Sequence, residues 1–222
     1  MKRVERLGEA KSPDGTTLTL YRHDGAYLIR ADGIELMSTR RHKSEDALAE
    51  IVCAPLHDRA NVRVLIGGLG LGFTLRAALA SLAPDARVVV VEIVKGVIDW
   101  NRNPAFGISA DLLSDARVDL RHADVADVIR GNPADFDAIM LDVDNGADPL
   151  TTAGNAQLYG KEGIRMTAAA LRPGGSIAYW SAQADPDFAK ALRGAGLTVE
   201  VMKVHAHGSS GSQHTLFVAQ SG

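Results

Sequence analysis

The chain has 222 residues, of which 46% are hydrophobic, enough to fill the core of one domain with a small appendage. A net charge of -3 at pH 7 argues against a broadly basic surface, so no nucleic-acid partner is expected. Cys53 is the single cysteine, which excludes an internal disulfide, and no stretch is apolar over the roughly 18 residues of a membrane span. The charged start predicts no signal peptide, so we expect a soluble, cytoplasmic protein with no membrane partner.

The N-terminal part favours short antiparallel strands. Residues 16–30 alternate apolar and polar side chains around Asp24-Gly25, which predicts a hairpin, and residues 31–37 add another strand. Residues 1–43 are therefore predicted to form a small β-meander domain. A helix is expected next, over residues 44–56, with Ser44 as its N-cap and its end near Pro55.

The remainder, residues 44–222, is predicted to be a Rossmann-like transferase domain of the α/β class. Short apolar strands separated by helices indicate a parallel sheet that is covered on both faces. The expected strands are residues 62–68, 87–93, 117–124, 136–143 and 174–181, and the expected helices between them are residues 72–82, 94–102, 125–131 and 159–171. Residues 198–207 and 214–220 are expected to form a closing antiparallel hairpin.

A glycine-rich turn follows the first of these strands, in the sequence VLIGGLGLGF at residues 64–73. A P-loop is excluded because Gly72 is followed by Phe73 and Thr74 rather than by Lys and Ser or Thr. The dinucleotide fingerprint is excluded because its third glycine would fall on Phe73 or Leu75. The remaining G-x-G-x-G pattern, Gly68, Gly70 and Gly72, resembles motif I of class I S-adenosylmethionine-dependent transferases.

Three acids end the three strands that follow. Glu92 stands twenty residues after the loop, where a carboxylate can accept hydrogen bonds from both ribose hydroxyls. Asp124 is suited to the adenine amine, and Asp142 is expected to face the sulfonium. Each acid alone could be an ordinary helix N-cap, but three at consecutive strand ends predict a site for S-adenosylmethionine.

The order of elements resembles a more specific family. The β-meander, the helix ending in APL, the glycine loop, FDAIMLDVDNG at 136–146 and LYGKEGIRMTAAALRPGG at 158–175 together resemble the spermidine synthase (aminopropyltransferase) family, over nearly the whole chain. The resemblance implies a Rossmann-like domain with a small N-terminal β-domain, commonly as a homodimer.

The residues that the resemblance assigns to polyamines are largely replaced. The family's loop reads G-G-G-D-G-G, and its acid pairs with the amine of decarboxylated S-adenosylmethionine; Leu71 stands at that position. The family's Tyr-x-Glu pair, the second acid of its D-x-x-D run and its later tyrosines are also lost, and fall on Ala47, Ala49, Asn145, Gly163 and Ile164. A dicationic diamine needs carboxylates at both ends, so these losses favour a different, small-molecule acceptor.

Candidate residues for that acceptor lie around the fourth and fifth strand ends. Asp142 matches the family's first catalytic acid, which orients and deprotonates an attacking amine, with Asp144 as the second choice. The other candidates for acceptor binding are Arg40, Arg41, His42, Asn145, Thr152, Asn155, Tyr159, Trp180 and Ser181. The arginines would suit a carboxylate or phosphate, although a solvated basic loop would explain them equally well, and Trp180 could equally belong to the core.

The expected activity is methyl transfer from S-adenosylmethionine to a small nucleophile. The alternatives are aminopropyl transfer from decarboxylated S-adenosylmethionine, which Leu71 disfavours, and a catalytically silent nucleoside-binding module. His205, His207 and His214 lack a cysteine or carboxylate that would complete a metal site, so no metal is predicted.

Overall fold

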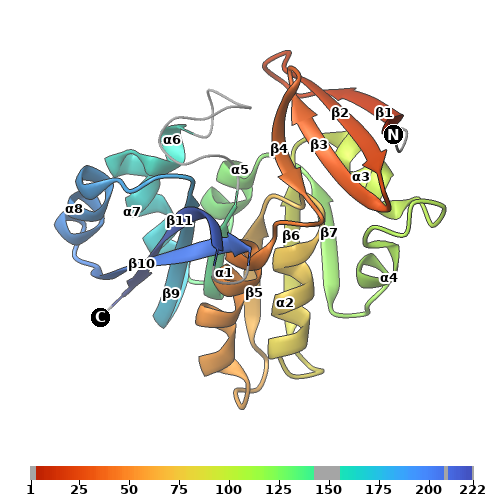
Figure 1. The fold of residues 1–222 in the computed structure, drawn as a ribbon. Coiled ribbons are helices and arrows are strands. Elements are labelled where there is room, and N and C mark those ends of the chain that lie inside the picture. Colours follow the sequence, from red (N-terminus) through yellow and green to blue (C-terminus); the bar gives the residue numbers. More distant parts are fainter. Residues whose placement is uncertain (1–3, 143–155, 208–209, 222) are drawn as a thin grey trace.

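The structure, a computed structural model, describes residues 4–142, 156–207 and 210–221 (Figure 1). Its N-terminal part is a four-stranded antiparallel sheet whose strands are neighbours in chain order. These strands are β1 (Val4–Lys11), β2 (Thr17–His23), β3 (Ala26–Ala31) and β4 (Ile34–Ser38). Asp24 and Gly25, both with positive φ, connect β2 to β3, which confirms the predicted hairpin. β1 was not predicted as a separate strand.

A helix and a short 3-10 turn connect this sheet to the second one. They are α1 (Lys43–Cys53) and η1 (Ala54–Leu56). The prediction that Ser44 caps the helix is wrong, because the N-cap is His42 and Ser44 lies within the first turn. The Ser44 hydroxyl is fully buried and bonded to Glu45 and His214 instead.

The rest of the chain alternates strands and helices. The elements are β5 (Arg63–Gly67), α2 (Phe73–Ser81), β6 (Arg87–Glu92), α3 (Lys95–Arg102), α4 (Ala110–Leu113), β7 (Val118–His122), α5 (Val125–Arg130), β8 (Phe136–Leu141), α6 (Ala156–Tyr159), α7 (Lys161–Ala169), β9 (Leu171–Ser181), α8 (Pro186–Gly194), β10 (Thr198–His207) and β11 (Ser210–Gln220). The strand order is β10-β11-β9-β8-β5-β6-β7; pairing is parallel from β9 to β7, and β11 is antiparallel to both β9 and β10. This confirms the α/β class and the closing hairpin.

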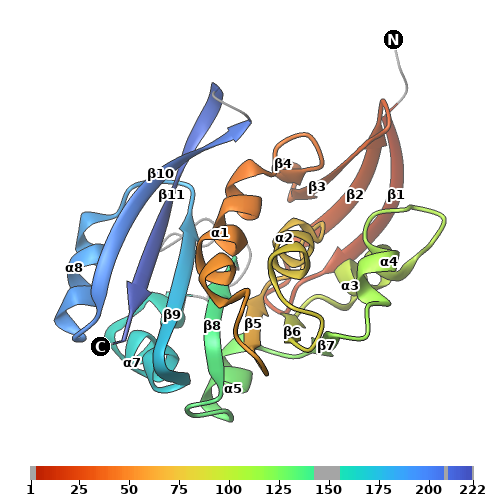
Figure 2. The ribbon, with the colours of Figure 1, turned by 90° about the horizontal axis from the view of Figure 1, so that it is seen from below.

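Both faces of the large sheet are buried, as its apolar strands predict. Along β6, Val88 and Val90 belong to one core cluster, whereas Val89 and Val91 belong to the other. Figure 2 shows α1 and α2 on one side of the sheet, and α5 and α7 on the other. A strand that alternates between two covered faces needs apolar residues at every position, and this explains the run of four valines.

The small sheet is fixed to the large domain by close backbone approaches. A Cβ added to Gly8 on β1 would lie 2.4 Å from the Trp100 indole nitrogen, and one added to Gly96 would lie 2.3 Å from the Ala10 Cβ. Glycine at these two positions therefore allows β1 to pack directly against α3. This contact holds the N-terminal sheet at the carboxyl edge of the parallel strands.

The chain reverses direction of winding at β5, which lies between β8 and β6. In open α/β sheets, ligands bind at the carboxyl ends of the strands beside such a point. The glycine loop follows β5 and Asp142 follows β8, so both lie at this position.

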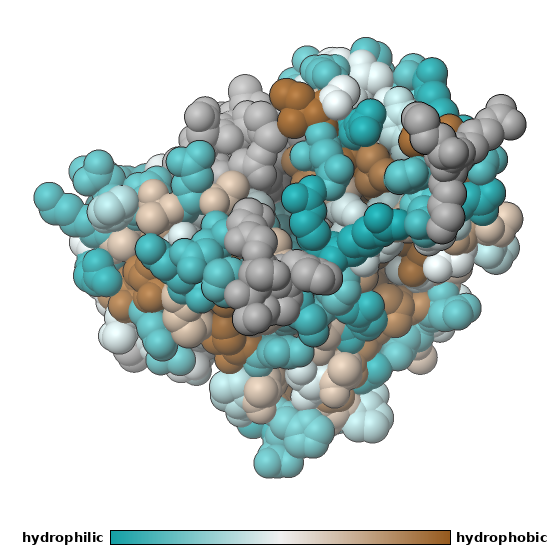
Figure 3. Space-filling view, in the orientation of Figure 1, coloured by the Kyte–Doolittle hydropathy of each residue, from teal (hydrophilic) through white to brown (hydrophobic). Residues whose placement is uncertain are grey.

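The outer surface is mainly hydrophilic on the face drawn in Figure 3, with hydrophobic residues in small separate groups. Within the described ranges, no helix is both long and apolar enough to cross a membrane.

Candidate functional site

The glycine loop between β5 and α2 needs glycine for its backbone conformation. Gly68, Gly70 and Gly72 have φ of 92°, 51° and 81°, in the region that side chains disfavour. Two hydrogen bonds fix the loop. The backbone amide of Gly68 donates to the Val91 carbonyl at 2.8 Å, and the side-chain amide of Asn101 donates to the Gly70 carbonyl at 2.9 Å. The loop therefore presents backbone, without side chains at three positions, and leads directly into the N-terminus of α2.

Glu92, at the end of β6, holds this loop from the next strand. The Leu69 amide donates to one carboxylate oxygen at 3.0 Å, and the Val94 amide donates to the other at 2.8 Å. Burial raises the pKa of the Glu92 carboxyl, although these amide bonds oppose the shift. Glu92 also lines the cavity, so its carboxylate both holds the loop and faces the space where a ligand would lie.

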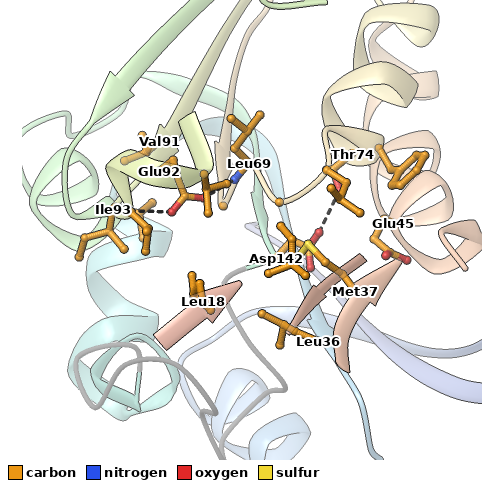
Figure 4. Close-up of a pocket in the computed structure, with 18 of the residues that line it drawn as sticks. Leu18, Leu36, Met37, Glu45, Leu69, Thr74, Val91, Glu92, Ile93 and Asp142 are labelled. Carbon is orange, nitrogen blue, oxygen red and sulfur yellow. Dashed lines mark hydrogen bonds between the residues drawn. The ribbon is translucent and has the colours of Figure 1, made fainter. Parts of the chain in front are cut away.

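Asp124 follows β7, which pairs with β6, and Asp142 follows β8, which pairs with β5 on the other side of the glycine loop. Asp124 caps α5, with the Ala126 amide donating to its carboxylate at 2.8 Å, and it also faces the cavity, so capping and binding are compatible here. Asp142 accepts a hydrogen bond from the Thr74 hydroxyl at 3.1 Å (Figure 4). That bond orients the Asp142 carboxylate from the first turn of α2.

These groups line one cavity that is closed on the opposite side by the N-terminal sheet. Met37 on β4 approaches the loop so closely that a Cβ on Gly70 would lie 3.0 Å from its sulfur. The described residues that line the cavity are Leu18, Ile29, Leu36, Met37, Glu45, Gly68, Leu69, Gly70, Leu71, Phe73, Thr74, Val91, Glu92, Ile93, Val94, Val97, Ala123, Asp124, Val125, Asp142 and Trp180.

The charge of the cavity is one-sided. Its described walls contain four carboxylates, Glu45, Glu92, Asp124 and Asp142, and no lysine, arginine or histidine. A cavity with apolar walls and several carboxylates favours cations over anions, because water cannot screen the charges effectively there. This arrangement does not support the expected acceptor with a carboxylate or phosphate.

The basic residues proposed for that acceptor make other contacts. Arg40 lies 3.6 Å from the Asp24 carboxylate, and Arg41 forms an ion pair with Glu35. His42 lies 2.7 Å from a carboxylate oxygen of Asp46, and its ring stacks on Phe73. None of these three basic residues is among the described residues that line the cavity.

The remaining candidates divide between the cavity, the core and the undescribed segment. Trp180 lines the cavity, and its ring meets His214 edge-on with the centroids 4.7 Å apart. Tyr159 is not among the described lining residues. Its ring packs against Tyr179 and Phe188 in the core cluster that also contains Val89 and Val91. Asp144, Asn145, Thr152 and Asn155 lie outside the described residues.

Two of the C-terminal histidines do not share a face of their hairpin. His214 pairs with Val204 and His205 pairs with Gln213, so His205 and His214 point to opposite faces of the ribbon. Across the described ranges, no three His, Cys, Asp or Glu side chains gather as metal ligands would.

Sequence reasoning missed Glu45 and the apolar wall that β2, β3 and β4 contribute. Glu45 was one acid among several in a short amphipathic helix, and its direction depends on how α1 is rotated against the sheet. The signal that could have found it is its spacing: Glu45 stands four residues, about one helical turn, before Ala49, where the resemblance places a glutamate.

Comparisons with known proteins give a consistent assignment. Residues 46–188 match the family model described as "Spermine/spermidine synthase domain". A curated relative, polyamine aminopropyltransferase 2 of Pseudomonas aeruginosa, is 30% identical over 122 residues, which are 55% of this chain and 34% of the relative. The matched region thus spans about a third of that relative's length.

Solved structures share the fold. The spermidine synthase from Thermotoga maritima superposes with a TM-score of 0.75 at 22% identity, covering 98% of this chain and 73% of that one. A probable spermidine synthase from Corynebacterium glutamicum superposes with a TM-score of 0.66 at 18% identity, covering 96% and 79% of the two chains. A spermidine synthase in complex with the transition-state analogue AdoDATO superposes with a TM-score of 0.74 at 21% identity, covering 98% of this chain and 73% of that one.

These findings correct the expected activity. Methyl transfer with intact S-adenosylmethionine is wrong as the main interpretation, because the matching family model is that of spermine/spermidine synthases and the curated relative is a polyamine aminopropyltransferase. Although several of the family's acids are replaced, α1 directs another acid, Glu45, into the cavity. The match over 46–188, together with the fold and the loop geometry, shows that this chain belongs to the spermine/spermidine synthase domain family.

Proposed function

We propose that the protein transfers an aminopropyl group from decarboxylated S-adenosylmethionine to a small amine acceptor. The observation that carries the proposal is the cavity of four carboxylates without a described basic residue, in a chain of this family. Decarboxylation removes the negative group of the donor and leaves a sulfonium and an ammonium, both cations. An acid-lined, partly apolar cavity favours that donor over the intact, zwitterionic-tailed form.

Three groups are assigned to the nucleoside part of the donor. The glycine loop offers backbone that can lie against the donor, Glu92 accepts the ribose hydroxyls, and Asp124 accepts from the adenine amine. Support for these roles comes from their positions on consecutive strand ends around one cavity.

Asp142 is assigned to the attacking amine. The amine nitrogen forms a bond to the propyl carbon next to sulfur, the carbon–sulfur bond breaks, and its electron pair stays on sulfur, giving neutral methylthioadenosine. The nitrogen must lose one proton, which Asp142 accepts and passes to solvent. Thr74, bonded to one oxygen of Asp142, positions the carboxylate for this step.

The test uses each donor separately with a panel of primary amines, and chromatography to identify the nucleoside product. The proposal expects methylthioadenosine from decarboxylated S-adenosylmethionine, in an amount that depends on the amine. It is contradicted if no amine gives methylthioadenosine, or if intact S-adenosylmethionine gives S-adenosylhomocysteine at a comparable or higher rate.

A further inference from the structure

The first turn of α1 directs a carboxylate, that of Glu45, into the cavity. Glu45 lies partly buried on the cavity wall, together with residues of β4 and the glycine loop. The Ser44 hydroxyl donates to its carboxylate at 2.5 Å, and the same hydroxyl lies 2.8 Å from the Nδ1 atom of His214 on β11. Ser44 therefore connects Glu45 to a strand 170 residues away and holds the carboxylate in place.

Glu45 lies at the end of the cavity away from the nucleoside groups. In Figure 4, Glu92 is at one side of the cavity, Glu45 is at the other, and Asp142 stands between them. If Glu92 binds the ribose and Asp142 binds the reacting nitrogen, Glu45 faces the end of the acceptor that is remote from the reacting nitrogen. Leu36 and Met37 of β4, on the same wall, are apolar and suit a hydrocarbon chain.

The position of Glu45 relates simply to the acid that the family resemblance leads one to expect. Glu45 and Ala49 are four positions apart, so they lie on the same face of α1, about one turn or about 6 Å apart along its axis. Ala49 is fully buried and Ala47 is partly buried, so neither can contribute a charge. Glu45 therefore offers a carboxylate on the same helix face, one turn nearer the N-terminus, and the cavity has an acid on each side of Asp142.

We propose that Glu45 binds the distal ammonium of an alkyl diamine acceptor, while Asp142 orients the nitrogen that attacks. This role rests on the proposed function for its chemistry, and on the cavity and the α1 geometry for its position. It makes Glu45 a specificity residue, which discriminates diamines from monoamines of the same length.

The electrostatic setting of Glu45 agrees with a cationic ligand. Burial raises the pKa of the Glu45 carboxyl, which means that its negative charge is incompletely stabilised without a ligand. An ammonium group held beside it would supply the missing opposite charge and a charge-assisted hydrogen bond.

The test measures binding rather than turnover, by calorimetric titration of 1,4-diaminobutane and 1-aminobutane into protein saturated with methylthioadenosine. The wild type is expected to bind the diamine more tightly than the monoamine. Glu45→Gln should weaken diamine binding roughly 10- to 100-fold, the range of one charge-assisted hydrogen bond, and remove the preference for the diamine. Glu50→Gln, an exposed change on the same helix, is the matched control and should retain both affinities.

Three results would overturn the assignment. The first is equal or unmeasurable binding of the two amines by the wild type, and the second is an unchanged preference for the diamine in Glu45→Gln. The third is a loss of affinity in that variant that is confined to decarboxylated S-adenosylmethionine, which would place Glu45 beside the donor tail. The last is tested by comparing donor with methylthioadenosine in the same variant. Failure of the proposed function is distinguishable, because it appears as absent methylthioadenosine release while Glu45-dependent diamine binding persists.

Discussion

The two halves of the cavity use carboxylates in different ways. On the donor side, Glu92 and Asp124 are bonded to backbone amides of the loop and of α5, so they stabilise the fold as well as face the cavity. On the acceptor side, Asp142 and Glu45 are bonded to the hydroxyls of Thr74 and Ser44. The carboxylates of Glu92 and Asp124 are thus held by backbone amides, whereas those of Asp142 and Glu45 are held by single side-chain hydroxyls.

The largest expected effect lies at the centre of the cavity. Asp142→Asn should lower the transfer rate about 10²- to 10⁴-fold, the range for loss of a positioned proton acceptor, because the amide keeps the size but cannot take the proton. Methylthioadenosine affinity should change by no more than about threefold if Asp142 acts on the acceptor.

Rates are measured by methylthioadenosine release, with the exposed change Asp127→Asn as control. A variant that keeps wild-type turnover would remove Asp142 from the chemistry and blur the distinction between the two halves.

Glu92 should show the double role of the donor side. Glu92→Gln replaces one acceptor oxygen with an amide nitrogen, so one of the Leu69 and Val94 amides loses its acceptor. We expect methylthioadenosine binding to weaken roughly 10- to 1000-fold, and the free energy of unfolding to fall by about 1 to 3 kcal/mol. Calorimetry and chemical denaturation of the same variant measure both quantities. Weaker binding with unchanged stability would argue against a structural role for Glu92.

Asp124→Asn separates binding from capping. Asparagine caps helices about as well as aspartate, so stability should change by less than about 0.5 kcal/mol. Methylthioadenosine binding should weaken about 3- to 20-fold, from loss of a charge-assisted bond to the adenine amine. The two variants measured together show whether binding and stability are coupled at Glu92 and independent at Asp124, as the geometry requires.

Leu71→Asp restores the acid that the family resemblance places in the loop. It should favour decarboxylated S-adenosylmethionine over methylthioadenosine by about fivefold to tenfold relative to the wild type, since only the former carries the aminopropyl ammonium. Leu71 is 4% exposed, so a loss of stability is also expected, and Leu71→Asn is the uncharged control. Equal effects of Asp and Asn would mean that the donor tail does not reach the loop.

The smallest predicted effect is a pH dependence of acceptor binding. Because the pKa of Glu45 is raised, this carboxyl becomes protonated at a higher pH than an exposed glutamate does. The affinity for 1,4-diaminobutane should therefore fall severalfold as the pH drops below the pKa of Glu45. The other titratable groups around it are His42 and Asp46 on the same segment, His214 through Ser44, and Asp142 in the cavity.

The stability of the ligand-free protein should depend on pH in the opposite direction from diamine binding. A carboxyl with a raised pKa contributes stability that is present at low pH and lost as the pH rises through the folded-state pKa. Glu45→Gln should therefore flatten the slopes of both binding and stability. Titrations at several pH values that leave the slopes unchanged in this variant would assign them to another group.

The donor side could be predicted largely from sequence, whereas on the acceptor side only Asp142 could. Strands that are apolar at every position indicate a sheet covered on both faces. Gly68, Gly70 and Gly72 mark the turn, because glycine adopts positive φ values at the lowest steric cost. Strand ends then bring Glu92, Asp124 and Asp142 together by topology alone.

Acceptor residues depend on contacts between distant parts of the chain. Ser44 was expected to cap α1, but its hydroxyl is engaged by His214 from the last strand. Arg41 was expected at the cavity, but Glu35 on β4 pairs with it, and Tyr159 was expected there but packs in the aromatic core. Such pairings depend on how elements dock, which local patterns do not encode.

The most direct test of the central claim is a competition between the two donors. Equal amounts of intact and decarboxylated S-adenosylmethionine are mixed with wild-type protein and 1,4-diaminobutane, and the acceptor product is identified by mass spectrometry. The acid-lined cavity predicts that the diamine gains an aminopropyl group and that Glu45→Gln lowers this product far more than Glu50→Gln. A diamine that gains a methyl group, or that remains unmodified while the protein binds methylthioadenosine, would contradict the account.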